Sequence, residues 1–189
     1  MVKVNVLSKN GTFLFRFNDG EFGSKWCGLW KDRTKYFDYF AFEVNDEFLS
    51  KDNVQNFEFY NTQFERYTFK TKDGLVTEEI SCIENGIMVA LKSSFDATVK
   101  TEIGINIRDR SENYVLSKVY KVESKENRIS ASIDDKTAYI FFSNGEFKIS
   151  PYYGVHRPGL YARDNGFSKY FDDGSPQNKF IPGTIKSNI

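Results

Sequence analysis

The chain has 189 residues with 26 basic and 26 acidic side chains, so its formal net charge is zero. Hydrophobic residues make up 40% of the sequence and aromatic residues 17%, which excludes a disordered chain and is enough for a well-buried core. Because the charges are interspersed without a basic stripe, we expect no nucleic-acid partner.

The N-terminal residues alternate between apolar and polar from Val2 to Val6, whereas a signal peptide needs a continuous apolar stretch of about 7–15 residues. No segment has the ~20 apolar residues of a membrane span. The two cysteines, Cys27 and Cys82, form neither a disulfide framework nor a metal-type spacing. We therefore expect a cytoplasmic protein with no membrane partner, no metal and no cofactor.

Apolar residues recur with a period of two along most of the chain, and no ten-residue window has helical spacing. Side chains on a strand alternate between faces, so each series predicts one buried face and one wetter face. The series are Phe13 to Phe17, Phe40 to Val44, Ile87 to Leu91, Val99 to Ile107 and Ile129 to Ile133.

Pairs of Asn or Asp with Gly separate these runs, and such pairs tolerate the positive φ angles of tight hairpin turns. They occur at Asn10-Gly11, Asp19-Gly20, Asp73-Gly74, Asn85-Gly86 and Asn144-Gly145. About a dozen short strands with this spacing predict an all-β fold, a large antiparallel β-sandwich.

Composition changes after Ser150, because all four prolines and many glycines lie beyond it. Proline is poorly tolerated in central strands. We therefore predict that residues 1–150 form the sandwich. Residues 151–189 are expected to be a loop-rich, edge-wrapping segment and linker of the same domain, with a short strand near Gly166–Phe171.

The aromatic stretch from Trp26 to Val44 is the most unusual part of the sequence. If Tyr36 to Val44 is one strand, Phe40 and Phe42 face the core, together with Tyr36, Asp38 and Val44. Phe37, Tyr39, Ala41 and Glu43 then form an amphipathic, half-exposed side. Trp26, Trp30, Phe37 and Tyr39 either belong to the core or a domain interface or contact a sugar.

Residues for catalysis are few. Histidine occurs once, at His156, and we interpret it as packed among tyrosines in a loop rather than as a base or zinc ligand. Glycoside hydrolysis needs two carboxyl groups facing each other at about 5–10 Å, whereas adjacent residues on a strand point apart. We interpret Glu78-Glu79, Asp134-Asp135 and Asp172-Asp173 as surface or turn charge, and no glycine-rich phosphate loop is present.

The segments "GLWKDRTKYFDYFAFEVNDEFLS" and "FERYTFKTKDGLVTEEISCIENGIMVALKSSFDATVKTEIGINIRDR" resemble the N-terminal domain of prokaryotic and archaeal glycogen-debranching enzymes of the amylo-α-1,6-glucosidase type. The resemblance covers residues 11 to 125. It rests on a Gly-Leu-aromatic segment, a charged strand from Gly74 to Ile83 and an apolar one from Ile87 to Phe95. Many relatives carry Asp-Thr-Arg where this chain reads Asp32-Arg33-Thr34.

The resemblance implies a β-sandwich preceding a helical (α/α) barrel that holds the catalytic acid and base. The chain itself would then be non-catalytic, and its partners would be the barrel and an α-glucan. The loops from Trp26 to Thr34 and from Tyr152 to Tyr161 would reach the substrate cleft. The candidate contact residues are Trp30, Tyr152, His156, Arg157 and Tyr161.

Three alternatives remain open at this stage. The first is a stand-alone α-glucan-binding module, the second is a self-contained enzyme using carboxylates, and the third is a purely structural role.

Overall fold

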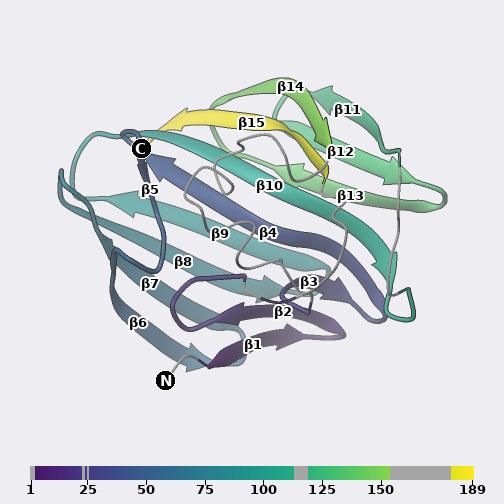
Figure 1. The fold of residues 1–189 in the computed structure, drawn as a ribbon, viewed down its shortest axis with the longest axis horizontal. Coiled ribbons are helices and arrows are strands. Elements are labelled where there is room, and N and C mark those ends of the chain that lie inside the picture. The colour runs from purple at the N-terminus through teal and green to yellow at the C-terminus, as the bar shows by residue number, and fades with distance from the viewer. Residues whose placement is uncertain (1–2, 23, 25, 113–118, 154–179) are drawn as a thin grey trace.

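The computed structural model describes residues 3–22, 24, 26–112, 119–153 and 180–189. Within these ranges the protein consists of fifteen strands in three antiparallel sheets, and no helix occurs (Figure 1). The predicted all-β fold with antiparallel, sandwich-type sheets is therefore confirmed. Among the described residues, none forms a helix of the length and apolar character needed to cross a membrane.

The largest sheet, sheet A, has eight strands and contributes to both hydrophobic clusters. In spatial order its strands are β1 (Val4–Lys9), β2 (Thr12–Phe17), β3 (Gly28–Lys31), β4 (Thr34–Val44), β10 (Thr98–Asp109), β15 (Phe180–Asn188) and β14 (Glu146–Tyr153), with β5 (Glu47–Phe48) paired to the end of β4.

Two smaller sheets form the second layer and lie toward opposite ends of sheet A (Figure 1). Sheet B consists of β6 (Val54–Asn61), β7 (Phe64–Lys70), β8 (Leu75–Ile83) and β9 (Gly86–Ser93). Sheet C consists of β11 (Lys121–Lys125), β12 (Arg128–Ile133) and β13 (Lys136–Phe141).

Each small sheet makes its own core with sheet A. Val99 of β10 belongs to the cluster with sheet B, and Ile105 and Ile107 of the same strand belong to the cluster with sheet C. Because these three residues have the same parity on one strand, both small sheets pack on the same face of sheet A. We call this the inner face and the opposite one the outer face.

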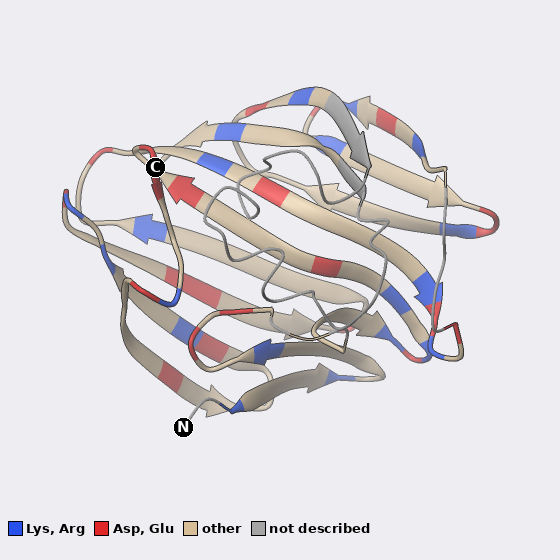
Figure 2. Ribbon diagram, viewed as in Figure 1, with Lys and Arg blue, Asp and Glu red and all other residues tan. Residues whose placement is uncertain are grey.

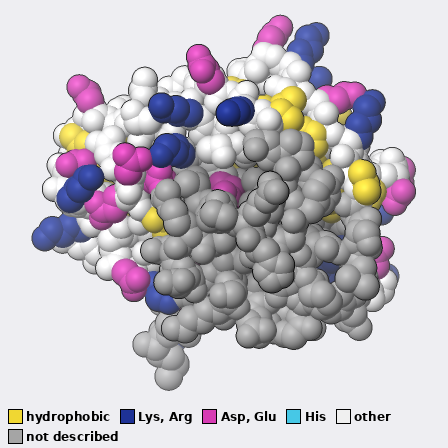
Figure 3. Space-filling view, turned by 45° about the horizontal axis from the view of Figure 1, so that its top comes forward, with side chains coloured by type: hydrophobic (Ala, Val, Ile, Leu, Met, Phe, Trp, Pro, Cys, Tyr) yellow, Lys and Arg dark blue, Asp and Glu magenta, His cyan; other side chains and the backbone are white. Residues whose placement is uncertain are grey.

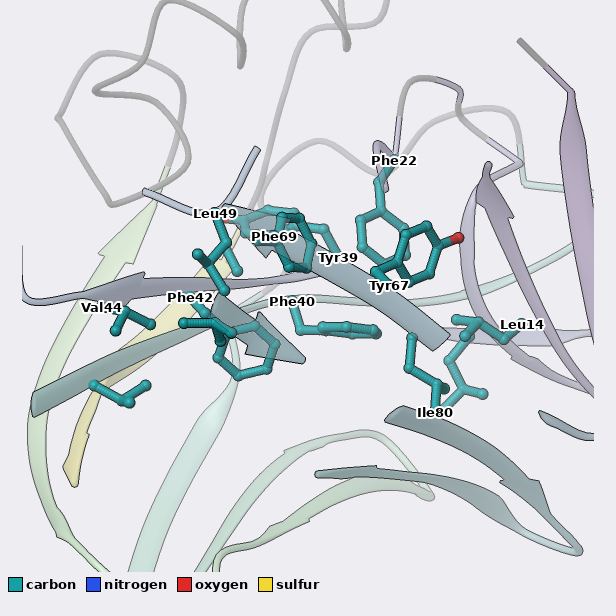
Figure 4. Packing of buried hydrophobic residues seen from close by; sticks show 14 of the residues in the cluster. Leu14, Phe22, Tyr39, Phe40, Phe42, Val44, Leu49, Tyr67, Phe69 and Ile80 are labelled. Atoms are coloured by element: carbon teal, nitrogen blue, oxygen red, sulfur yellow. The ribbon is translucent and has the colours of Figure 1, made fainter. Parts of the chain in front are cut away.

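The cluster with sheet B is rich in aromatic rings (Figure 4). Phe40 lies edge-on to Phe22, with ring centroids 4.9 Å apart, and next to Phe42 at 5.9 Å. The placement of Phe40 and Phe42 in the core is therefore confirmed. The expected half-exposed side of β4 is wrong for Tyr39, Ala41 and Glu43, which are buried as well, whereas Phe37 is half-buried. Strand β4 lies between β3 and β10 in the middle of sheet A, and from Asp38 to Val44 its side chains are buried on both faces.

Strand β2 also differs from expectation. Phe13, Phe15 and Phe17 do share one side, but that side is only half-buried. The buried side carries Thr12, Leu14 and Arg16, which face sheet B. There the Thr12 hydroxyl donates to the Glu84 carbonyl, and Arg16 pairs with Glu78. Polar partners across the sheets, which the alternation pattern does not reveal, decide the orientation of this strand.

Two of the predicted turns are confirmed as hairpins between neighbouring strands. Asn10 and Gly11 take φ angles of 46° and 77° and join β1 to β2. Asp134-Asp135 joins β12 to β13, also as predicted. Asn144-Gly145 instead connects β13 with β14, which belong to different sheets.

The C-terminal segment is where the structure departs most from expectation. Residues 180–188 form β15, which lies between β10 and β14 rather than along an edge or in a linker. Pro182 is accommodated because no residue pair joins it to β10 or to β14, where the register of each ladder shifts. The strand predicted near Gly166–Phe171 lies outside the described residues.

Candidate functional site

The five candidate contact residues differ in where the structure places them. Trp30 lies in β3 and is buried, at 4% exposure. Tyr152 lies in β14, where its backbone pairs with Ile181. His156, Arg157 and Tyr161 lie outside the described residues. The segment from Trp26 to Thr34, expected as a loop, contains β3 and its tight turn into β4, because β3 pairs with β2 and β4 on both sides.

Trp26 and Trp30, the only tryptophans of the chain, stack on each other at the end of β3. Their ring centroids are 6.0 Å apart, with an interplanar angle of 29°. The Trp30 indole Nε1 donates to the Trp26 carbonyl at 2.9 Å. Gly28 between them has a φ of 108°, which a side chain would disfavour, and this lets the chain turn back so that the rings meet. Trp26 is 46% exposed, so the stack has one buried and one solvent-facing ring.

Two cations border the buried ring. The Lys35 ammonium lies 5.7 Å and the Arg108 guanidinium 5.2 Å from the Trp30 ring centroid. Lys35 forms an ion pair with Asp38, both being almost completely buried. Burial lowers the pKa of Lys35, and the nearby Asp38 carboxylate opposes that shift. The Asn106 side-chain amide donates at 3.2 Å to Asp38 Oδ1, the same oxygen that Lys35 contacts.

Asp38 reaches this cluster through a β-bulge. Tyr39 pairs with Gly104 and Phe37 pairs with Ile105, so Asp38 is the extra residue on β4. The bulge turns its side chain toward Asn106 on the outer face, instead of toward the core with Phe40 as the alternation predicted. Sequence periodicity contains no signal for this bulge.

A second polar pair lies further along the same face. The Tyr39 hydroxyl donates to Glu102 Oε1 at 2.8 Å, and both side chains are buried. Beyond it Lys100 contacts Glu43 at 2.6 Å and Asp46 at 2.7 Å. The outer faces of β4 and β10 thus carry a row of polar and charged groups, and Figure 2 shows the positions of the charged ones along the two ribbons.

Gly104 makes this arrangement possible, since a Cβ at that position would overlap the ring of Tyr39. We expect Gly104→Ala to lower the free energy of unfolding by about 1–3 kcal/mol, because the ring must move and its hydroxyl must leave Glu102. Gly86→Ala is the matched control, with no atom within 4 Å of the added carbon, and is expected to change stability little. Urea unfolding of both variants tests this, and equal losses would contradict the close-packing account.

The adjacent carboxylate pairs do not form an acid–base site in the part of the chain that the structure describes. Glu78 and Glu79 point to opposite faces, as predicted, but Glu78 is not surface charge. It is fully buried and paired with Arg16, because its side of β8 faces sheet A. Glu79 pairs with Arg66 and Lys92 on the outside of sheet B. Asp172-Asp173 lies outside the described ranges.

Thiol and metal chemistry find no support in the described residues. Cys27 and Cys82 are both buried and free. Burial raises the pKa of the Cys27 thiol to about 11, so this thiol stays protonated and weakly nucleophilic at neutral pH. No group of three or more His, Cys, Asp or Glu residues that could hold a metal ion occurs within these ranges.

The surface of the described part carries acidic and basic side chains side by side, without a large patch of one sign in the view of Figure 3. The stacked tryptophans with Lys35, Asp38, Asn106 and Arg108 form the most distinctive side-chain arrangement of the described part, and Trp26 is its exposed member. We call these six residues the tryptophan cluster.

No family model, curated protein or solved structure matches the chain.

Proposed function

We propose that the chain is a non-catalytic β-sandwich domain that contacts an α-glucan through the tryptophan cluster. The observation that carries this proposal is the position of Trp26. Its indole is 46% exposed and rests against a buried Trp30, so a flat apolar surface is held in place at low entropic cost. An exposed aromatic face held in a fixed position is what stacking on the apolar face of a sugar ring requires.

The sequence resemblance extends the proposal to the whole protein's activity. In that form, the chain is the N-terminal domain of a glycogen-debranching, amylo-α-1,6-glucosidase-type glycoside hydrolase, and it supports and shapes the cleft of an (α/α) barrel partner. The antiparallel sandwich-type fold agrees with this assignment. Glu78 forms a buried ion pair with Arg16, and Asp38 forms one with Lys35. Because these carboxylates already neutralise buried cations, their pairing favours a non-catalytic role.

Intrinsic fluorescence provides a direct test, since both tryptophans of the chain belong to the cluster. We expect maltoheptaose at millimolar concentration to quench the emission of the wild-type protein. Trp26→Ala should weaken binding by about tenfold, as expected for one lost aromatic stacking contact. A calorimetric titration is needed for this variant, because its fluorescence is altered by the substitution itself.

Phe141→Ala is the control, because Phe141 is 70% exposed and lies on sheet C, away from the cluster. It should bind like the wild type. If neither protein responds to the oligosaccharide, direct glucan contact by this domain is wrong.

The alternative, a stand-alone α-glucan-binding module, is favoured by the same exposed Trp26 and predicts binding by the isolated chain without any partner. Both forms predict that the purified chain hydrolyses neither maltooligosaccharides nor α-1,6-linked glucosides. Turnover by the chain alone would contradict both.

A further inference from the structure

A second polar cluster lies in the core between sheets A and B, away from the tryptophans. It contains Arg16 on β2, Glu65 on β7 and Glu78 on β8, which are 5%, 1% and 0% exposed. Two carboxyl groups therefore share one guanidinium in an interior surrounded by aromatic rings. Burial of an unbalanced charge is costly, so such a group favours its neutral form.

Arg16 is held mainly by Glu78. Its Nη1 donates to Glu78 Oε1 at 2.9 Å, and its Nε donates to the Gly20 carbonyl at 2.8 Å. The guanidinium carbon also lies 4.5–5.0 Å from the ring centroids of Phe22, Phe40 and Tyr67.

Glu65 has no comparable partner. Neither of its oxygens, nor Oε2 of Glu78, has a hydrogen-bond partner within the described residues. Glu65 pairs with Ile80 across the β7–β8 ladder, so Glu78 is its diagonal neighbour on the same face. The other polar groups that act on Glu65 are Arg16 from β2 and the Tyr67 hydroxyl from its own strand, and the neutral Asn5 amide from β1 acts on that hydroxyl in turn. The Tyr67 hydroxyl donates to the Phe17 carbonyl at 2.9 Å.

We propose that Glu65 is a proton-operated latch between sheets A and B. With the proton bound, the neutral carboxyl group fits the aromatic interior and the two sheets stay tightly packed. When the proton leaves, a second carboxylate appears beside Glu78, and the packing of β7 and β8 against sheet A weakens.

The electrostatics agree with this geometry. Burial raises the pKa of Glu65 to about 7, with Arg16 lowering it and Glu78 raising it further. The unfolded chain releases this proton near the ordinary value of 4.5. Between these two values the folded state holds a proton that the unfolded state has lost. The contribution of Glu65 to stability is therefore fully present below pH 4.5, is lost as the pH rises to about 7, and does not change further above that.

The test is urea unfolding of the complete chain between pH 5 and pH 8. For the wild type, the unfolding constant should rise on the order of a hundredfold from Glu65 alone. Glu65→Gln, which keeps the shape but cannot ionise, should remove this rise. The two proteins share every other titratable group, so the difference in slope between wild type and Glu65→Gln isolates the Glu65 contribution.

Glu79→Gln is the matched control, because Glu79 is the neighbour of Glu78 on β8 but points outward to Arg66 and Lys92. Those partners lower its pKa, so its titration falls outside this window and the wild-type slope should persist. Should Glu65→Gln not fold, carbon-13 NMR of the Glu65 carboxyl in the wild-type protein gives its ionisation directly. An unchanged slope in Glu65→Gln, or ionisation near pH 4.5, would overturn the latch.

Discussion

Replacing Arg16 with methionine is expected to lower the free energy of unfolding by about 3–5 kcal/mol, the cost of breaking a buried ion pair from one side. Methionine fills much of the same space, so loss of volume is not the main cause. The substitution leaves Glu65 and Glu78 buried without their cation and removes the guanidinium from among the rings of Phe22, Phe40 and Tyr67. Urea unfolding at pH 7 measures the effect.

Two further variants identify the cause. Arg66→Met removes an ion pair on the solvent side of β7, where water screens the charges, and should have a far smaller effect. Arg16→Met combined with Glu78→Leu should recover part of the lost stability, since replacing both partners of a buried pair with apolar groups is often neutral. Equal effects of Arg16→Met and Arg66→Met would show that the buried pair is not important for the packing of the two sheets.

Trp30→Ala is the second substitution with a large expected effect, again about 3–5 kcal/mol. The indole is almost completely buried and contacts Trp26, Lys35 and Arg108. Its loss leaves a cavity beside two cations and removes the hydrogen bond to the Trp26 carbonyl. Far-UV circular dichroism is the suitable probe of unfolding, because the substitution removes one of the two fluorescent residues.

Trp26→Ala is its natural comparison, since Trp26 is nearly half exposed. We expect a much smaller loss of stability but the larger loss of glucan binding. The comparison separates the buried ring, Trp30, from the exposed ring, Trp26, for which we propose contact with the ligand. If Trp30→Ala costs no more stability than Trp26→Ala, the proposed division of roles is wrong.

The sequence predicts fold class well because strand periodicity and turn chemistry are local. Asn10-Gly11 and Asp134-Asp135 form hairpins for reasons contained in two residues, namely their tolerance of positive φ and their position between strand-forming runs. The placement of Phe40 and Phe42 in the core likewise follows from alternation within one strand.

Features that depend on other strands could not be predicted in this way. Glu78 is buried because Arg16, 62 positions away, faces it across the sandwich. Asp38 points outward because a bulge forms against Gly104 and Ile105 of β10. Residues 180–188 form an interior strand despite Pro182 because the register shifts on both sides. Each of these outcomes is set by pairing between distant segments.

The candidate site could also be predicted only in part, because it depends on pairing between distant strands. Trp30 is identifiable from the aromatic stretch, but its buried position and its contacts with Lys35 and Arg108 require the pairing of β3, β4 and β10. The sequence could therefore point to the ring but not to its role as the support for Trp26.

The measurement that tests glucan contact most directly is a nitrogen-15 NMR titration of the isolated chain with maltoheptaose. The proposal predicts chemical-shift changes in the Trp26 and Trp30 indole signals and in amides from Trp26 to Asp38, with saturation in the millimolar range. An absence of changes at that concentration, or changes clustered on sheet B or sheet C instead, would contradict it.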